Sequence, residues 1–91
     1  MSDVVRRRAV VAGRVQGVWY RDSARQEAER LGLAGRAVNR ADGTVLLEAE
    51  GRADLVEAFL AWAADGPPRS RVETVAVEPI EPTGQAGFTI A

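Results

Sequence analysis

The sequence predicts an α+β fold in which two helices pack on one face of a mainly antiparallel sheet. Two segments, residues 20–31 and 53–64, repeat apolar residues at helical spacing. Shorter segments before and after them alternate apolar and polar residues, as strands do. The 91 residues suffice for one hydrophobic core, so we expect a single domain over residues 1–91.

The first strand is predicted over residues 4–15. Alternate positions from Val5 to Val15, apart from Arg7, are apolar or glycine and fall on one face, whereas Arg6 and Arg8 fall on the other. We interpret the arginine run that contains these two residues as an exposed strand end. The first helix then occupies residues 20–31, and Gly32 is its expected stop because glycine readily adopts the left-handed conformation.

Two strands joined by a tight turn follow, at residues 34–39 and 45–50. Asp42-Gly43 between them tolerates the positive φ values of a hairpin turn, and Gly51 is expected to end the second strand. The remaining elements are a helix over 53–64 and strands over 72–77 and 88–90. With right-handed crossovers, this β-α-β-β-α-β order plus a short C-terminal strand gives a split βαβ sandwich, the ferredoxin-like architecture.

The residue types present restrict the chemistry. The chain has no cysteine, histidine or lysine, which excludes thiol nucleophiles, imidazole bases and Schiff-base formation. Any catalysis must therefore use arginine, carboxylates, amides, hydroxyls and backbone N–H groups. Glu48 and Glu50 share a strand face and could act as an acid–base pair, but we favour a solvent-facing row.

Charge and hydropathy give no indication of a macromolecular partner. The net charge of −1 argues against nucleic acid and membrane surfaces. No segment approaches the roughly 20 apolar residues of a membrane span. Paired arginines near the N-terminus suggest an export signal, but the apolar stretch after them, Ala9–Ala12, is too short for one. We expect a cytoplasmic protein.

The segment GRVQGVWYR, residues 13–21, connects the first predicted strand to the first helix. Consecutive backbone N–H groups in such a loop can converge on an anion, and the helix N-terminus adds further donors. Gly13 and Gly17 let the chain bend tightly and approach an oxyanion, while Arg21 offers a planar fork for two phosphate oxygens. The spacing alone leaves a second reading open, a tight strand–helix turn with a surface arginine.

This loop and a second motif resemble the acylphosphatase family. The family signature has the form G-R-V-Q-G-V-x-[FY]-R, and the second family motif is similar to GRAVNRADGTVLLEAEG at residues 35–51. The resemblance covers nearly the whole chain, including the closing Phe-x-Ile. Two departures are visible: Ala37-Val38 stands where valine–arginine is more usual, and the chain ends at Ala91 without the tyrosine that closes many members.

The resemblance implies which residues form the site. The family's phosphate-binding arginine falls on Arg21, and its water-positioning asparagine falls on Asn39. The backbone cradle falls on six consecutive residues: Val15, Gln16, Gly17, Val18, Trp19 and Tyr20. The Trp19 ring is expected at the mouth of the pocket. Asp42 is interpreted as a turn residue rather than an acid or base.

The implied activity is hydrolysis of the carboxyl–phosphate anhydride of a small-molecule acyl phosphate, with a carboxylate and inorganic phosphate as products. The conjugate acid of the leaving carboxylate has a pKa of about 4, so no general acid is needed. Arg21 and the loop amides would stabilise the phosphoryl transition state without a metal or other cofactor. Asn39 would orient the attacking water, and a substrate phosphate oxygen would take its proton. We expect a monomer.

Three other functions stay open at this level. RNA-binding and regulatory domains share this fold class, although the first strand lacks the aromatic residues of the usual RNA-binding surface. An acylphosphatase-like domain also occurs within a larger carbamoyl-transfer protein, which continues into cysteine-rich zinc segments that this chain lacks. An anion-binding protein without turnover would use the same residues.

Overall fold

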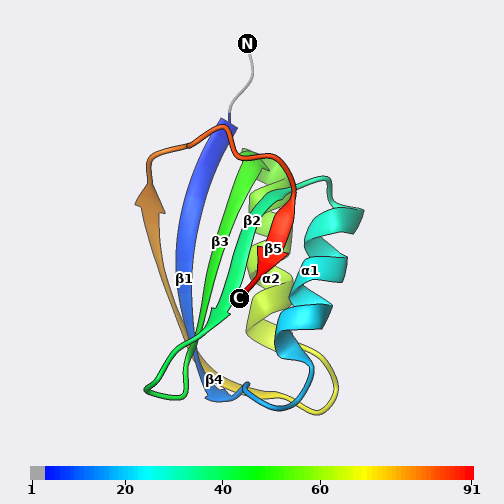
Figure 1. Cartoon of the computed structure of the whole chain (residues 1–91), viewed down its shortest axis with the longest axis vertical. Coiled ribbons are helices and arrows are strands. Elements are labelled where there is room, and N and C mark those ends of the chain that lie inside the picture. Colours follow the sequence, from blue (N-terminus) through cyan, green and yellow to red (C-terminus); the bar gives the residue numbers. More distant parts are fainter. Residues whose placement is uncertain (1–3) are drawn as a thin grey trace.

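The computed structural model describes residues 4–91, which form five strands and two helices in the predicted order (Figure 1). The bounds are β1 Val4–Arg14, α1 Tyr20–Arg30, β2 Ala34–Asn39, β3 Val45–Arg52, α2 Ala53–Asp65, β4 Arg71–Ile80 and β5 Phe88–Ile90. Two strands run past their predicted ends. β3 continues through Gly51 to Arg52, and β4 continues to Ile80 because Pro79 lies on an edge strand, where a missing N–H is tolerated.

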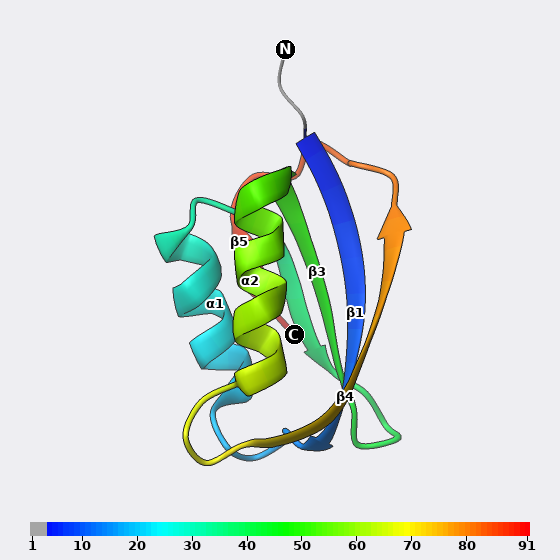
Figure 2. The same cartoon turned by 180° about the vertical axis from the view of Figure 1, so that it is seen from behind.

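The strands form one sheet in the order β4-β1-β3-β2-β5. β1 pairs antiparallel with β3 and β4, and β2 pairs antiparallel with β3, whereas β5 joins β2 in parallel. Both helices cover the same face of this sheet (Figure 2). The predicted α+β sandwich with a mainly antiparallel sheet is confirmed.

The hydrophobic core lies between the helices and the sheet. Tyr20 at the start of α1 and Phe59 in α2 are fully buried. The Tyr20 hydroxyl donates to the Ala63 carbonyl at 2.7 Å, and burial raises the pKa of this hydroxyl, so it stays a donor. Trp62 packs on both aromatic rings, with centroids 5.5 Å from Tyr20 and 6.0 Å from Phe59. These contacts fix the first turn of α1 against α2.

Gly13 lies where β1 and β4 approach each other closely. The pairing of β1 with β4 shifts register between Ala12 and Gly13. A Cβ on Gly13, whose φ is 126°, would lie only 2.1 Å from the Arg71 carbonyl oxygen. The missing side chain of Gly13 permits the close approach of β4.

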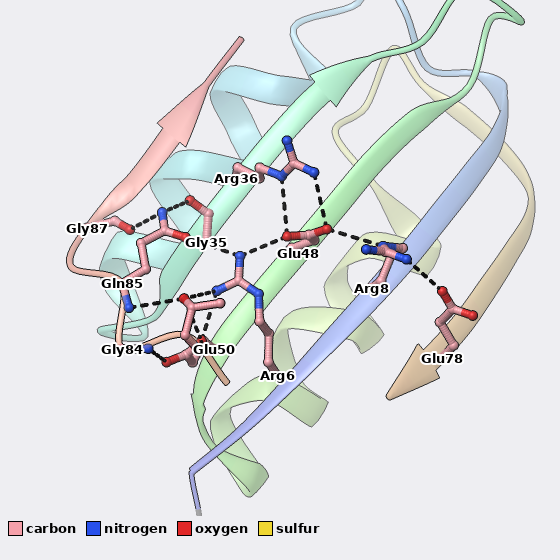
Figure 3. A network of polar contacts seen from close by, with 11 residues as sticks. Arg6, Arg8, Gly35, Arg36, Glu48, Glu50, Glu78, Gly84, Gln85 and Gly87 are labelled. Atoms are coloured by element: carbon pink, nitrogen blue, oxygen red, sulfur yellow. Dashed lines mark hydrogen bonds and ion pairs between the residues drawn. The ribbon is translucent and has the colours of Figure 1, made fainter. Parts of the chain in front are cut away.

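Glu48 and Glu50 are buried, so the prediction of a solvent-facing row is wrong. Both contact Arg6, which is only 3% exposed, and the Arg6 guanidinium donates to each carboxylate at 2.8 Å (Figure 3). Arg8 and Arg36 donate to Glu48 as well, each at 3.2 Å. The prediction of an exposed strand end is also wrong at Arg6, because its side chain is buried against both carboxylates.

The protonation of these carboxylates follows from their donors. Burial alone would raise the pKa of Glu48, but hydrogen bonds from Arg36 and Arg6 outweigh it and lower that pKa to about 2. Burial likewise opposes ionisation of Glu50, yet bonds from the Thr83 backbone N–H and from Arg6 lower its pKa. Both groups are carboxylates at neutral pH, so the cluster is a buried array of ion pairs.

The segment 81–87, which joins β4 to β5, encloses one end of this array. It crosses from one edge of the sheet to the other (Figure 1). Thr83 and Gly84 each donate a backbone N–H to Glu50 at 2.8 Å. The Gln85 side chain donates to a backbone carbonyl of β2 at 2.6 Å (Figure 3). The connection is thereby tied to the sheet face opposite the helices.

Replacing Arg6 with methionine should lower the free energy of unfolding by about 3 kcal/mol, because two buried carboxylates then lose their shared donor. Arg8→Met is the matched control on the same strand. Its side chain is 40% exposed and its ion pairs are screened by water, so we expect a clearly smaller loss than for Arg6. Urea unfolding at neutral pH measures both values. Equal losses in the two variants would contradict the structural importance of the buried cation.

Candidate active site

Three strand ends meet at one end of the sheet. β1 and β2 both run antiparallel to β3, and Val11 of β1 and Asn39 of β2 are both paired with Val45 of β3. β5 runs parallel to β2 and ends at Ile90. This register brings Asn39, the end of β5 and the connection after β1, residues 15–19, to the same region of the molecule.

The connection 15–19 leads directly into α1. Gly17 has a φ of 73° and Trp19 a φ of 65°, so both lie in the left-handed region. Glycine adopts this conformation freely. Within residues 4–91, Trp19 is the only residue other than glycine with a positive φ, which costs about 1–2 kcal/mol. Strained positions of this kind cluster at functional sites. Left-handed residues in a short loop also favour convergence of backbone N–H groups on an anion.

The Gln16 side chain attaches this loop to the hairpin between β2 and β3. Its Nε2 donates to the Arg40 carbonyl at 2.7 Å and to the Thr44 carbonyl at 2.8 Å. Arg40 directly follows Asn39, so these bonds hold the loop beside the segment that carries Asn39. The Gln16 side chain is thus committed to the hairpin, which leaves its backbone for the predicted cradle.

A cleft of about 240 Å³ opens where these segments meet. It is lined by Val15, Gly17, Trp19, Tyr20, Arg21, Asp22, Asn39 and Ile90. This volume is several times the roughly 30 Å³ share of one water, so a tetrahedral anion and a water fit together.

The cleft brings together Arg21 and Asn39, the two residues predicted to act in catalysis. It includes four of the six predicted cradle residues, whereas Gln16 and Val18 do not line it. Ile90 also lines it, although sequence reasoning assigned this residue only to a strand. Its one signal was its place in the closing Phe-x-Ile.

Arg21 lies in the first turn of α1 and its side chain is directed at the end of β5. One guanidinium N–H donates to the backbone oxygen of Ala91 at 2.5 Å. A guanidinium carries five N–H donors, so this bond steadies the side chain and leaves other donors for a ligand. The neighbouring Asp22 carboxylate lies 3.6 Å from Arg25, one turn further along the helix.

The Asn39 side chain presents an unpaired acceptor. Its Oδ1 is buried and has no hydrogen-bond partner within residues 4–91. Buried polar atoms nearly always have a partner, and Asn39 lines the cleft. A water in the cleft would provide that partner. By donating to Oδ1, such a water would keep an oxygen lone pair free for attack.

Asp42 stabilises the hairpin turn. Its carboxylate accepts from the Thr44 hydroxyl at 2.6 Å and from the Thr44 N–H at 3.0 Å. The hydroxyl bond is the largest of the effects that lower the pKa of Asp42. Asp42 is absent from the cleft lining, which agrees with its interpretation as a turn residue.

Within residues 4–91, no group of three or more histidine, cysteine, aspartate or glutamate side chains is placed to hold a metal ion. Within the same range, no helix combines the length and the apolar character needed to cross a membrane.

The fold and the cleft together define a small α+β domain of ferredoxin-like type, with a guanidinium and a buried amide facing one cavity. Its topology is shared with many unrelated activities, so the sequence has to decide the family. The sequence model of the acylphosphatase family matches residues 7–90, and the chain belongs to this family. Hydrolysis of acyl phosphates is the known activity of the family.

Individual relatives agree with this assignment. The chain is 48% identical over 87 residues to an acylphosphatase of Anaeromyxobacter dehalogenans, covering 96% of this chain and 94% of that protein. Its structure is similar to that of an acylphosphatase from Coxiella burnetii, with a TM-score of 0.93 and 34% sequence identity. The match covers 97% of this chain and 93% of that protein. It is also similar to full-length HypF in the phosphate- and nucleotide-bound form, with a TM-score of 0.92 and 27% identity. That match covers all of this chain and only 12% of HypF.

Proposed function

We propose that this chain hydrolyses acyl phosphates in the cleft between residues 15–20, Arg21 and Asn39, without a metal or other cofactor. The observation that carries the proposal is the meeting of these groups in one cavity, although they come from separate elements. The substrate is a small-molecule acyl phosphate, and the products are a carboxylate and inorganic phosphate.

The phosphate is held by the start of α1. Backbone N–H groups of residues 15–20 and the positive end of the helix dipole meet the phosphoryl oxygens, and Arg21 adds a bidentate pair of donors. Charge on the equatorial oxygens in the transition state strengthens each of these bonds. The support for this arrangement is the left-handed loop geometry and the orientation of Arg21 by Ala91.

The water is held by Asn39. It donates one hydrogen to Oδ1 and attacks phosphorus in line with the leaving carboxylate, while a phosphate oxygen accepts its other proton. The P–O bond to the acyl group breaks, and the carboxylate leaves without protonation because it is a weak base. The unpaired buried Oδ1 supports this role.

A domain within a longer protein is the second candidate, since HypF contains a region of this fold. The Anaeromyxobacter dehalogenans relative, 94% of which is covered, is by contrast little longer than the matched region. We propose one domain over residues 1–91, acting as a cytoplasmic monomer.

Purified protein in the presence of a chelator should release inorganic phosphate from acetyl phosphate well above the buffer rate. A phosphate monoester such as p-nitrophenyl phosphate should be a poor substrate, because its leaving group is a much stronger base. Phosphate release followed over time measures both reactions. Turnover that disappears with the chelator would overturn metal independence, and no turnover in any buffer would overturn the enzymatic proposal.

Arg21→Lys should reduce kcat/KM for acetyl phosphate by about 100-fold or more, because lysine keeps the charge but loses the planar fork. Arg25→Lys is the matched control, since Arg25 lies on the same helix and is absent from the cleft lining. Steady-state kinetics of both variants give the comparison. If Arg21→Lys retained near-normal activity, the phosphate would have to be held by other groups.

Asn39→Ala should lower kcat about 100-fold while the inhibition constant of inorganic phosphate changes by no more than about threefold, because water positioning is lost and phosphate binding is kept. Arg40→Lys, at the next position, controls for disturbance of the hairpin. Inhibition by phosphate and turnover are measured on the same preparations. Loss of phosphate affinity with kcat preserved would contradict the role given to Asn39.

A further inference from the structure

Trp19 is the most exposed of the large apolar side chains within residues 4–91. It is 70% exposed, whereas Val77 and Val4, the other two in this class, are 49% and 45% exposed. Of the three, only Trp19 lines the cleft. An indole held in solvent at the edge of a substrate cavity is available to contact whatever extends out of that cavity.

The local backbone does not favour tryptophan at this position. Trp19 is the N-cap of α1, yet its side chain makes no capping bond, and its φ of 65° is left-handed. Serine, threonine, asparagine, aspartate or glycine cap helices better, and glycine or asparagine adopts the left-handed conformation at less cost. The indole therefore contributes neither to the cap nor to the turn, which points to a role for the side chain itself.

The cleft has two chemically different parts. Arg21 and Asn39 supply the polar part, where the phosphoryl group belongs. Trp19 and the half-buried Ile90 supply apolar surface in the same lining. An acyl phosphate has the same division, with a dianionic phosphoryl group at one end and a carbon skeleton at the other.

We propose that Trp19, together with Ile90, forms an acyl subsite that selects substrates with an apolar and preferably aromatic acyl group. This inference rests on the function proposed above, because it needs the phosphoryl group to occupy the end of the cleft marked by Arg21. The flat indole offers offset or edge contacts to an aromatic ring, and Ile90 offers aliphatic contact. A two-carbon acyl group has too little surface to use either side chain.

The test compares benzoyl phosphate with acetyl phosphate, as a ratio of kcat/KM values, in the wild type and in Trp19→Gly. Glycine suits the left-handed backbone, so this change removes the indole without adding strain. We expect the ratio of benzoyl to acetyl phosphate to fall about fivefold. Trp19→Phe should restore most of the ratio, because a ring is again present.

Val77→Ala is the control, since it shortens an exposed apolar side chain on β4 away from the cleft and should leave the ratio unchanged. A ratio that stays the same in Trp19→Gly, with both substrates slowed equally, would overturn the acyl subsite and leave the hydrolase proposal intact. If the wild type hydrolyses neither substrate, the proposed function itself fails. Thermal unfolding of each variant separates these results from loss of folded protein.

Discussion

The pairing of β3 with its two neighbours determines where the site forms. Because β1 and β2 are both antiparallel to β3, they run parallel to each other, and their carboxyl ends lie at the same end of the sheet. Val45 faces Val11 on one side and Asn39 on the other. The loop after β1 and the amide at the end of β2 therefore become neighbours through a shared strand, and β5 joins them by adding in parallel to β2.

β3 also carries the buried ion pairs, which lie toward the opposite end of the sheet. Its Glu48 and Glu50 each accept from Arg6, and Glu48 also accepts from Arg8 of β1 and Arg36 of β2. A guanidinium reaches two carboxylates at once through different N–H groups, which the point charge of a lysine does less well. A register slip of one residue would turn these side chains to the other face of the sheet. The ion pairs thus favour one alignment of β1 on β3.

The sequence predicts what is local and misses what depends on distant segments. The helices and strands follow from apolar periodicity, and Arg21 and Asn39 follow from two motifs. Alternation assigned Glu48 and Glu50 to the correct shared face, but it could not indicate that Thr83 and its neighbours would cover that face more than thirty positions later. The place of Ile90 in the cleft had only the closing Phe-x-Ile as a signal, because it depends on the pairing of β5 with β2. Nothing in the sequence indicated the left-handed backbone at Trp19.

The two indoles of this chain occupy very different surroundings. The half-buried Trp62 packs on the core through the Tyr20 and Phe59 rings, while Trp19 is mostly in water beside the cleft. Indole emission responds to the polarity around the ring, so each tryptophan reports a different event. With one of the two replaced by phenylalanine, fluorescence can follow occupation of the cavity through Trp19 or disruption of the interior through Trp62, without any added label.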